Sequence, residues 1–350
     1  MSKRNGRQEP INVAILGAGR IAVTMAKTLI GMGQDDRYKN AVTPYAVATR
    51  DDPGRAAQFA SDYGFAHSYG SYESMLDDDD VDLVYIATPH AFHAEQAIEC
   101  MEHGKNVLVE KSFTATEEQA SRVFETSDRT GLLCTEAIWT RYLPSRQLIL
   151  DLVNDQRPQG IGPVHAVHAD LSYPVQDKAR MTDPALAGGA LLDLGVYPLN
   201  FIRMLFPQVN PTDIMTAAKL TDRKVDESNV TTMWLANGVK ATATSDMTCM
   251  SDRNGVIQGE KGYIVVDNVN NPKKIQVFGR DGALTKTCQA PPQITGFEYQ
   301  LMSSVDAIRQ GKRECTQMPH QETVFMMRLM DALRHNWGVW YPFESQDSRS

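Results

Sequence analysis

Three residues of this chain are able to handle a proton at a substrate oxygen. Asp193 and Tyr197 are four residues apart, a spacing that places both side chains on one face of a helix. Lys111 directly follows the apolar run Asn106–Glu110, where its ammonium can point at a bound hydroxyl or carbonyl. Each residue also has a plainer explanation, as a helix cap, a core tyrosine and a solvated lysine. The three therefore predict proton-transfer chemistry only if a ligand site lies between them.

A glycine-rich turn, Gly17–Ala22, has the pattern of a dinucleotide-binding loop. It follows the β-branched run Ile11–Leu16 and opens a segment with helical spacing. Gly17 permits a sharp turn, and Gly19 lets backbone N–H groups approach a pyrophosphate. The alternative is an ordinary glycine turn of an α/β domain. The strand before the turn and the helix after it favour nucleotide binding.

The residues after the second expected strand bear on which nucleotide binds. An acidic residue there grips the ribose 2′-hydroxyl of NAD, whereas this chain has Thr49 and Arg50, which suit a 2′-phosphate. Asp51 and Asp52 follow at once, so NAD and a purely surface role for Arg50 stay open. We predict NADP. The expected cofactor-binding residues are Gly17, Gly19, Arg20, Ile21, Thr49, Arg50, Thr88, Pro89, His93, Glu110 and Lys111.

The elements that must position these residues change character along the chain. In the first part, expected strands at Ile11–Leu16, Pro44–Thr49, Asp82–Thr88, Asn106–Glu110 and Leu132–Ala137 alternate with helices at Arg20–Met32, Arg55–Tyr63, Ala91–His103 and Thr116–Thr130. This alternation predicts an α/β fold, a doubly wound parallel sheet of the Rossmann type.

The second part predicts an α+β domain with a large, mainly antiparallel open sheet. Expected strands lie at Val164–Leu171, Val230–Leu235, Val239–Thr244, Gly255–Gly259, Tyr263–Asp267 and Lys274–Phe278, and helices at Ser145–Asn154, Ala187–Leu205, Phe297–Gln310 and His320–His335. We expect a Rossmann domain over 11–136 and a substrate and oligomerisation domain over 137–343. Flexible tails are expected at 1–10 and 344–350.

The composition excludes several classes of protein. Of 350 residues 42% are hydrophobic, enough for a substantial core, and the net charge of −8 argues against a nucleic-acid or membrane-surface binder. The five cysteines are widely spaced and form no CxxC pair, which is typical of reduced thiols. No signal peptide and no uncharged apolar run of membrane-spanning length is evident. We expect a cytoplasmic protein without a metal site.

Taken together, the motifs resemble those of the glucose–fructose oxidoreductase / inositol dehydrogenase (Gfo/Idh/MocA) family, close to its dimeric dihydrodiol dehydrogenase and D-xylose dehydrogenase branch. The resemblance covers nearly the whole chain. It rests on GAGRIA at 17–22, the stretch from Ala87 to Lys111, GGALLDLGVYP at 188–198, EAIWTRYLP at 136–144 and ITGFEYQLMSSVDAIRQG at 294–311.

The resemblance implies a cleft between the two domains in which hydride passes between the nicotinamide and a carbinol carbon. Tyr197 would move the hydroxyl proton, Lys111 would polarise the same oxygen and lower the pKa of the phenol, and Asp193 would orient Lys111 or hold a neighbouring hydroxyl. Ser112 replaces the family's usual proline, and because cis bonds are rare without proline, the sequence leaves open whether the cis bond often found there is present. Expected substrate contacts are His90, Trp139, Arg141 and Tyr173.

The predicted function is an NAD(P)-dependent dehydrogenase or reductase that acts on CH–OH groups of a neutral sugar or another vicinal diol. Two alternatives stay open: a non-catalytic nucleotide-sensing regulator on the same fold, and an enzyme that retains its cofactor and cycles it between two substrates. The open sheet of the second domain predicts a homo-oligomer, a dimer or a tetramer.

Overall fold

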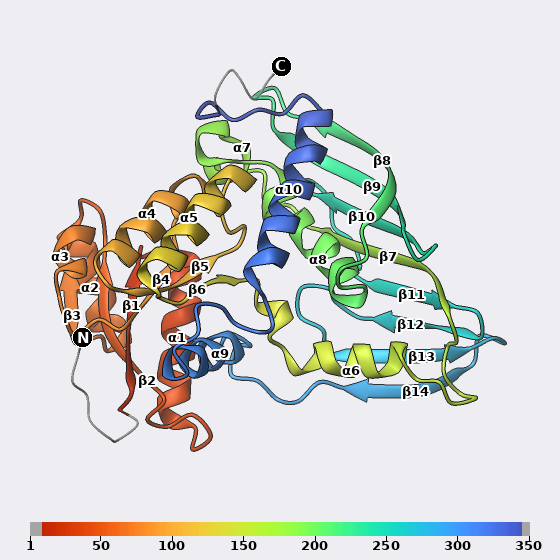
Figure 1. Ribbon diagram of the computed structural model, residues 1–350, viewed down its shortest axis with the longest axis horizontal. Coiled ribbons are helices and arrows are strands. Elements are labelled where there is room, and N and C mark those ends of the chain that lie inside the picture. The colour runs from red at the N-terminus through yellow and green to blue at the C-terminus, as the bar shows by residue number, and fades with distance from the viewer. Residues whose placement is uncertain (1–8, 345–350) are drawn as a thin grey trace.

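The computed structural model describes residues 9–344. The first part of the chain forms a six-stranded parallel sheet (Figure 1). The strand order is β3-β2-β1-β4-β5-β6. The strands are β1 (Ile11–Leu16), β2 (Val42–Ala48), β3 (His67–Tyr69), β4 (Leu83–Ile86), β5 (Asn106–Glu110) and β6 (Cys134–Ala137). The helices between them are α1 (Arg20–Gln34), α2 (Pro53–Tyr63), α3 (Tyr72–Leu76), α4 (His90–Glu102) and α5 (Glu117–Thr130). The predicted Rossmann architecture is confirmed.

Short apolar sequences account for the central strands of this sheet. All four residues of β4 are buried, as are five of the six in β1, which is what helices on both faces of a parallel sheet require. Helices α2 and α5 begin where the side chains of Asp52 and Thr116 accept backbone N–H groups of the first turn, and both end at a left-handed glycine. The segments β3 and α3 were not predicted from the sequence.

The second sheet has eight strands in the order β14-β13-β12-β11-β7-β10-β9-β8. The strands are β7 (Val164–Ser172), β8 (Pro211–Leu220), β9 (Asp226–Leu235), β10 (Lys240–Asp246), β11 (Gly255–Gly259), β12 (Gly262–Val266), β13 (Lys274–Gly279) and β14 (Leu284–Gln289). Neighbouring strands are antiparallel except β7 and β10, which run parallel. The predicted mainly antiparallel sheet is confirmed, with β8 and β14 as strands that the sequence analysis missed.

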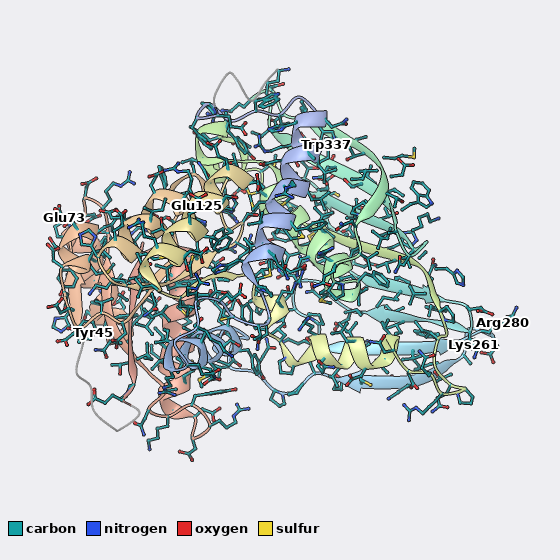
Figure 2. All side chains as sticks on the ribbon, in the orientation of Figure 1. Tyr45, Glu73, Glu125, Lys261, Arg280 and Trp337 are labelled. Carbon is teal, nitrogen blue, oxygen red and sulfur yellow. The ribbon has the colours of Figure 1, made fainter. Side chains whose placement is uncertain are left out.

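The remaining helical segments all come after β6 in the chain. They are the 3₁₀-helix η1 (Trp139–Arg141), α6 (Pro144–Val153), α7 (Ala179–Thr182), the 3₁₀-helix η2 (Pro184–Leu186), the π-helix η3 (Leu191–Gly195), α8 (Val196–Leu205), α9 (Glu298–Arg309) and α10 (His320–Asn336). Helix α8 packs on β7 and β10, while α10 packs on both α8 and α5, so both helices lie between the sheets (Figure 1). Near the end of α10, the Nε1 of Trp337 donates to Thr216 of β8 (Figure 2).

The C-terminal part of the chain returns to the first sheet. Phe297, Leu301 and Val305 share one hydrophobic cluster with Met25 and Leu29 of α1. Helix α9 therefore belongs to the core of the Rossmann sheet although it lies in the predicted second domain.

The most apolar helical stretch is internal. Pro184–Leu205 is the one helical stretch within residues 9–344 that is long and apolar enough to cross a membrane. However, 89% of its most apolar window is buried in the protein, as expected of a core helix.

The outer face of the second sheet carries apolar side chains in the edge strand β8 and in its neighbour β9. The register of β8 and β9 places Met215, Val230 and Trp234 on one face, and Met215 is 63% exposed. The predicted self-association through this sheet stays a prediction.

The predicted tails lie mostly outside the described residues. Glu344 is an exception, because its carboxylate pairs with the buried Arg334 and accepts the backbone N–H of Tyr341. Its prediction as part of a flexible tail was wrong, since these contacts anchor it.

Candidate active site

A cleft of about 480 Å³ lies where the carboxyl ends of the parallel strands meet the second sheet. It is lined by Gly19, Arg20, Ile21, Thr24, Ala87, Thr88, Pro89, His90, Glu110, Lys111, Trp139, Tyr173, Arg180, Leu186, Asp193, Tyr197, Asn270, Thr295 and Phe297. The three residues singled out for proton transfer are all in this set, although Lys111 is far from Asp193 and Tyr197 in the sequence.

Lys111 and Asp193 form a buried ion pair at the floor of the cleft. The Nζ of Lys111 donates to Oδ1 of Asp193 at 2.9 Å and to its backbone oxygen at 2.8 Å. Burial alone would raise the pKa of Asp193, but the charges of Lys111 and Arg180 outweigh it and hold that pKa well below its usual range. Asp193 is therefore a fixed anion that orients the lysine.

Tyr197 stands beside this pair, one helical turn after Asp193. The ammonium of Lys111 lies 5.1 Å from the centre of the phenol ring, and the phenol oxygen accepts a hydrogen bond from Trp139 Nε1 at 3.2 Å. Burial, followed by the neighbouring Glu110 carboxyl, raises the pKa of Tyr197 well above its usual range. The shift is thus opposite to the lowering that was expected from Lys111, whose ammonium donates to Asp193. The phenol is therefore protonated at neutral pH.

Glu110 adds a second titratable group to the cleft floor. Its two carboxyl oxygens accept from the Tyr85 hydroxyl and from the backbone N–H of Lys111. Burial raises the pKa of Glu110 to about 7. Near neutral pH this carboxyl is therefore only partly ionised. Its electrostatic repulsion of a negative charge on the Tyr197 oxygen is correspondingly weaker than that of a full carboxylate.

The glycine turn has the geometry of a phosphate site. Gly17 has φ +105°, and a side chain there would press on the backbone oxygen of Ala87 at 3.1 Å. At Gly19 a side chain would meet nothing within 4 Å, so the space beside it is open. No side chain caps the N-terminus of α1 and no acidic residue lies in its first turn, so its N–H groups are available to a phosphate. These residues fit a dinucleotide.

The end of β2 holds the residues expected to distinguish NADP from NAD. Arg50 is exposed, and its guanidinium lies 4.9 Å from the centre of the Phe92 ring. Asp52 is engaged as the cap of α2, and Thr49 donates to the backbone oxygen of Asp52. Arg55, which sequence analysis missed, donates to the backbone of Ala18 in the glycine turn at 2.8 Å. Thr49 therefore shapes the turn, while Arg50 stays available to a ligand.

The two histidines of the His90–His93 segment occupy different surroundings. His90 lines the cleft, and burial lowers its pKa to about 3, so it is neutral. His93 is fully buried, and its ring nitrogens lie 2.8 Å from the backbone oxygen of Thr88 and 3.0 Å from that of Ser112. His93 therefore connects the ends of β4 and β5 from behind the cleft, and its predicted place among the cofactor contacts was wrong.

The structure answers the question that the sequence left open at the peptide bond after Lys111. The Lys111–Ser112 bond is cis although residue 112 is not proline. Ser112 is fully buried, and its hydroxyl donates to the backbone oxygen of Leu192 at 2.7 Å.

Of the residues in η1, only Trp139 reaches the cleft. Its Nε1 bonds to both Tyr197 and Asn270. Arg141 is 2% exposed and points away, toward Asn200 and Glu322, so its prediction as a substrate contact was wrong. The short helix turns neighbouring residues to opposite sides, which the sequence pattern does not specify.

Arg180 is a site residue that sequence analysis missed. Its Nη1 lies 2.7 Å from Oδ1 of Asp193, and its side chain is 33% exposed in the cleft. The helix that carries it, α7, has only four residues and gives no periodic signal. The spatial contact with Asp193 identifies it.

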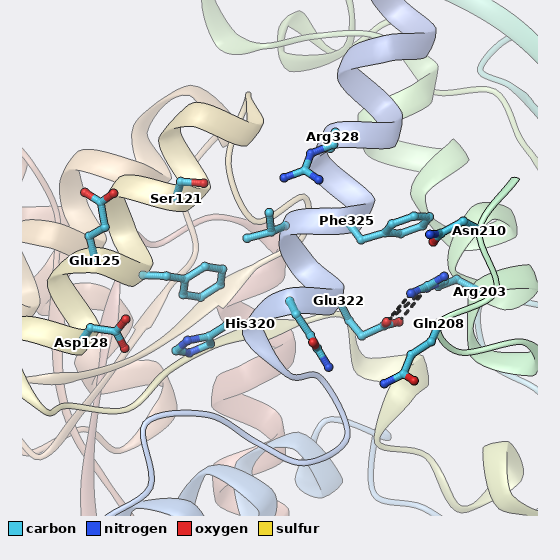
Figure 3. Close-up of a pocket in the computed structure, with 13 residues that line it drawn as sticks. Ser121, Glu125, Asp128, Arg203, Gln208, Asn210, His320, Glu322, Phe325 and Arg328 are labelled. Atoms are coloured by element: carbon cyan, nitrogen blue, oxygen red, sulfur yellow. Dashed lines mark hydrogen bonds and ion pairs between the residues drawn. The ribbon is translucent and has the colours of Figure 1, made fainter.

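A second, more open hollow of about 610 Å³ lies between α5 and α10 (Figure 3). Several of its charged side chains are engaged in ion pairs: Arg203 with Glu322, as the figure shows, Arg328 with Glu117, and Asp128 with Arg313. None of the residues around Lys111 lines it. The candidate active site is therefore the smaller cleft.

Comparisons with known proteins match both parts of the chain. Residues 11–138 match a family model described as "Oxidoreductase family, NAD-binding Rossmann fold", and residues 157–265 match the "GFO/IDH/MocA C-terminal domain". The chain is 33% identical to D-xylose 1-dehydrogenase (NADP(+)) of Hypocrea jecorina, over 97% of this chain and 95% of that protein. It is 27% identical to the Mus musculus trans-1,2-dihydrobenzene-1,2-diol dehydrogenase, over 96% and 98%.

Solved structures resemble the chain over nearly its whole length. A 3-ketoreductase from Actinomadura kijaniata, crystallised with NADP and TDP-benzene, superimposes with a TM-score of 0.80 at 25% identity. The overlap covers 93% of this chain and 98% of that one. An aldose–aldose oxidoreductase from Caulobacter crescentus shares the fold with a TM-score of 0.81 at 22% identity, over 93% and 97%.

Proposed function

Because the chain belongs to the GFO/IDH/MocA family of oxidoreductases, we propose that it transfers a hydride between NADP and a carbinol carbon of a sugar or another vicinal diol, with Tyr197 and Lys111 as the proton-transfer pair. The chain is an NAD(P)-dependent oxidoreductase of CH–OH groups, and its cofactor is NADP. The specific substrate and the roles of individual residues belong to the proposal.

The glycine turn, the N-terminus of α1 and Arg50 would hold the cofactor. Bound NADP supplies the hydride acceptor or donor at its nicotinamide ring. In carbonyl reduction, Tyr197 donates the phenol proton to the substrate oxygen, and the Lys111 ammonium polarises that oxygen. Asp193 keeps Lys111 in place. In alcohol oxidation the proton moves in the opposite direction, from the substrate hydroxyl to the phenol oxygen.

One observation supports the proposal most strongly. The Lys111 ammonium, anchored 2.9 Å from Asp193, lies over the ring of Tyr197 in the same cleft that opens onto Gly19. A proton donor and a cation thus converge beside the open end of the phosphate loop. A nucleotide-sensing protein needs the loop but has no use for the pair.

The test is the formation of NADPH by the purified chain with a panel of aldoses and vicinal diols. We expect turnover with at least one of them and no NADPH without substrate. Binding of NADP without turnover in either direction on any of them would favour the sensing alternative. Reduced nicotinamide that copurifies with the protein and is oxidised by added sugar would favour the alternative with a retained cofactor.

Arg50→Gln should weaken NADP use and leave NAD use nearly unchanged. A charge-assisted contact with a phosphate is strong, so we expect KM for NADP to rise about 10- to 100-fold and KM for NAD to change less than about threefold. Steady-state kinetics with both nucleotides measures this. Arg122→Gln, at a surface arginine paired with Glu95, is the matched control. Equal changes for both nucleotides would contradict the role of Arg50.

A further inference from the structure

We propose that Arg180 binds the second oxygen of the substrate, on the carbon next to the one oxidised, and so makes the enzyme selective for vicinal oxygens. This inference rests on the proposed function, in which Lys111 and Tyr197 hold the reacting oxygen. It assigns a substrate-recognition role to a residue outside that pair.

Lys111 and Arg180 lie close together, on the same carboxylate oxygen. Lys111 Nζ lies 2.9 Å and Arg180 Nη1 2.7 Å from the same carboxylate oxygen of Asp193. The two nitrogens therefore cannot be farther apart than the sum of these distances. Neighbouring oxygens of a diol, a hydroxyketone or a hydroxy acid are separated by a smaller distance, so one molecule can reach both cations.

Arg180 is the more accessible of the two cations. Its side chain is 33% exposed, against 13% for Lys111 and 6% for Asp193. The bond to Asp193 engages one guanidinium nitrogen, so the other N–H groups remain available to a ligand. A guanidinium only donates hydrogen bonds, and in a planar fork, so it selects an acceptor oxygen at a fixed place.

The two glycines of the GGALLDLGVYP segment hold the backbone around Arg180 through hydrogen bonds. The N–H of Gly189 donates to the backbone oxygen of Met181 at 2.8 Å, and that of Gly188 to Asp183 at 3.0 Å. A side chain at Gly188 would approach these same two oxygens to within 2.9 Å. The glycines thus permit the close packing that fixes α7 beside Asp193.

Positive charge exceeds negative charge around the place of the reacting oxygen. Asp193 is one anion between two cations, and Glu110, with its pKa raised by burial to about 7, is only partly ionised. Arg253, which does not itself line the cleft, lies 4.8 Å from the ring centre of Tyr173, which does. The surplus of positive charge suits electron-rich substrate oxygens in this part of the cleft.

The experiment compares a sugar with its counterpart that lacks the second oxygen. D-xylose and 2-deoxy-D-xylose differ only at the carbon next to the one that would be oxidised. We measure kcat/KM for both, with NADP, in the wild type and in Arg180→Met. If D-xylose is not turned over, the best aldose of the panel and its 2-deoxy form replace the pair.

We expect the preference of the wild type for D-xylose over the deoxy sugar to fall about 10- to 100-fold in Arg180→Met, the loss expected of one charged hydrogen bond. Arg180→Lys keeps the positive charge but loses the planar guanidinium, so it should retain part of the preference. It replaces Arg180→Met as the test variant if the latter does not fold. Arg223→Met should leave the preference unchanged. Arg223 is an exposed arginine that pairs with Asp183, the residue directly after α7, and it does not line the cleft.

An equal loss with both sugars in Arg180→Met would overturn the inference, because it would mean that Arg180 only holds Asp193. An unchanged preference in both Arg180 variants would overturn it as well. Neither result would affect the proposed function, whose failure is an absence of turnover by the wild type.

Discussion

Tyr197→Phe should lower kcat by about a thousandfold in both directions, within the range usual for loss of a general acid–base group. The change removes only the hydroxyl that would exchange the proton. In the structure this hydroxyl has one hydrogen-bond donor, Trp139 Nε1, which also bonds to Asn270 and keeps that contact. We therefore expect the stability to change by less than about 1 kcal/mol. Turnover measurements and thermal unfolding of the same preparation separate the two effects.

The matched control for this change is Tyr263→Phe, which removes a phenol hydroxyl from β12, outside the cleft. It should turn over like the wild type. Wild-type turnover in a folded Tyr197→Phe variant would assign the proton transfer to another group, with Lys111 the nearest candidate.

The same residue predicts the pH dependence of the two directions. Because burial raises the pKa of Tyr197 well above its usual range, the phenol is protonated at neutral pH. Reduction needs this acid form and should stay constant as the pH rises from neutral. Oxidation needs the base form and should become faster over the same interval. In Tyr197→Phe the rise with pH should disappear.

The sequence predicted the parts of the site that local patterns encode. The strand–glycine–helix order identified the turn at Gly17, and its φ of +105° shows why glycine stands there. The strand Asn106–Glu110 placed Lys111 at the carboxyl edge of the sheet. The four-residue spacing of Asp193 and Tyr197 indicated a shared helical face, and both side chains do reach the cleft.

The parts that were missed depend on tertiary contacts. Strand β8 starts with Pro211 and has small or polar residues at many positions, so it lacks the pattern of a buried strand. Arg180 is in the site because the glycines at 188 and 189 draw its short helix against Asp193. No local pattern in the sequence specifies that contact.

The incorrect assignment of Arg141 has a similar cause, and the true environment of this residue leads to a second large effect. Arg141 and Arg203 are both buried, and both donate to the carboxylate of Glu322. The cluster connects η1, α8 and α10. Because η1 also carries Trp139, the cluster supports one wall of the cleft from behind.

Glu322→Gln should lower the free energy of unfolding by about 3 to 5 kcal/mol, the cost of leaving buried charges without their partner. The variant keeps the size of the side chain but leaves two buried guanidinium groups facing a neutral amide. Equilibrium unfolding in urea measures the loss. Glu95→Gln, at an exposed glutamate paired with Arg122, is the matched control and should cost less than about 1 kcal/mol.

The pH dependence of this loss distinguishes a charge effect from a packing effect. Burial alone would raise the pKa of Glu322, but Arg203 and Arg141 outweigh it and hold the pKa below the ordinary value of 4.5. A lowered pKa means that the carboxylate contributes its full stabilisation above pH 4.5 and loses it as the pH falls through the lowered value. The wild type and Glu322→Gln should therefore differ most at neutral pH and converge in acid. A difference that stays constant down to strongly acidic pH would show that the loss in Glu322→Gln does not come from the missing charge, because a charge effect has to disappear when the carboxylate is protonated.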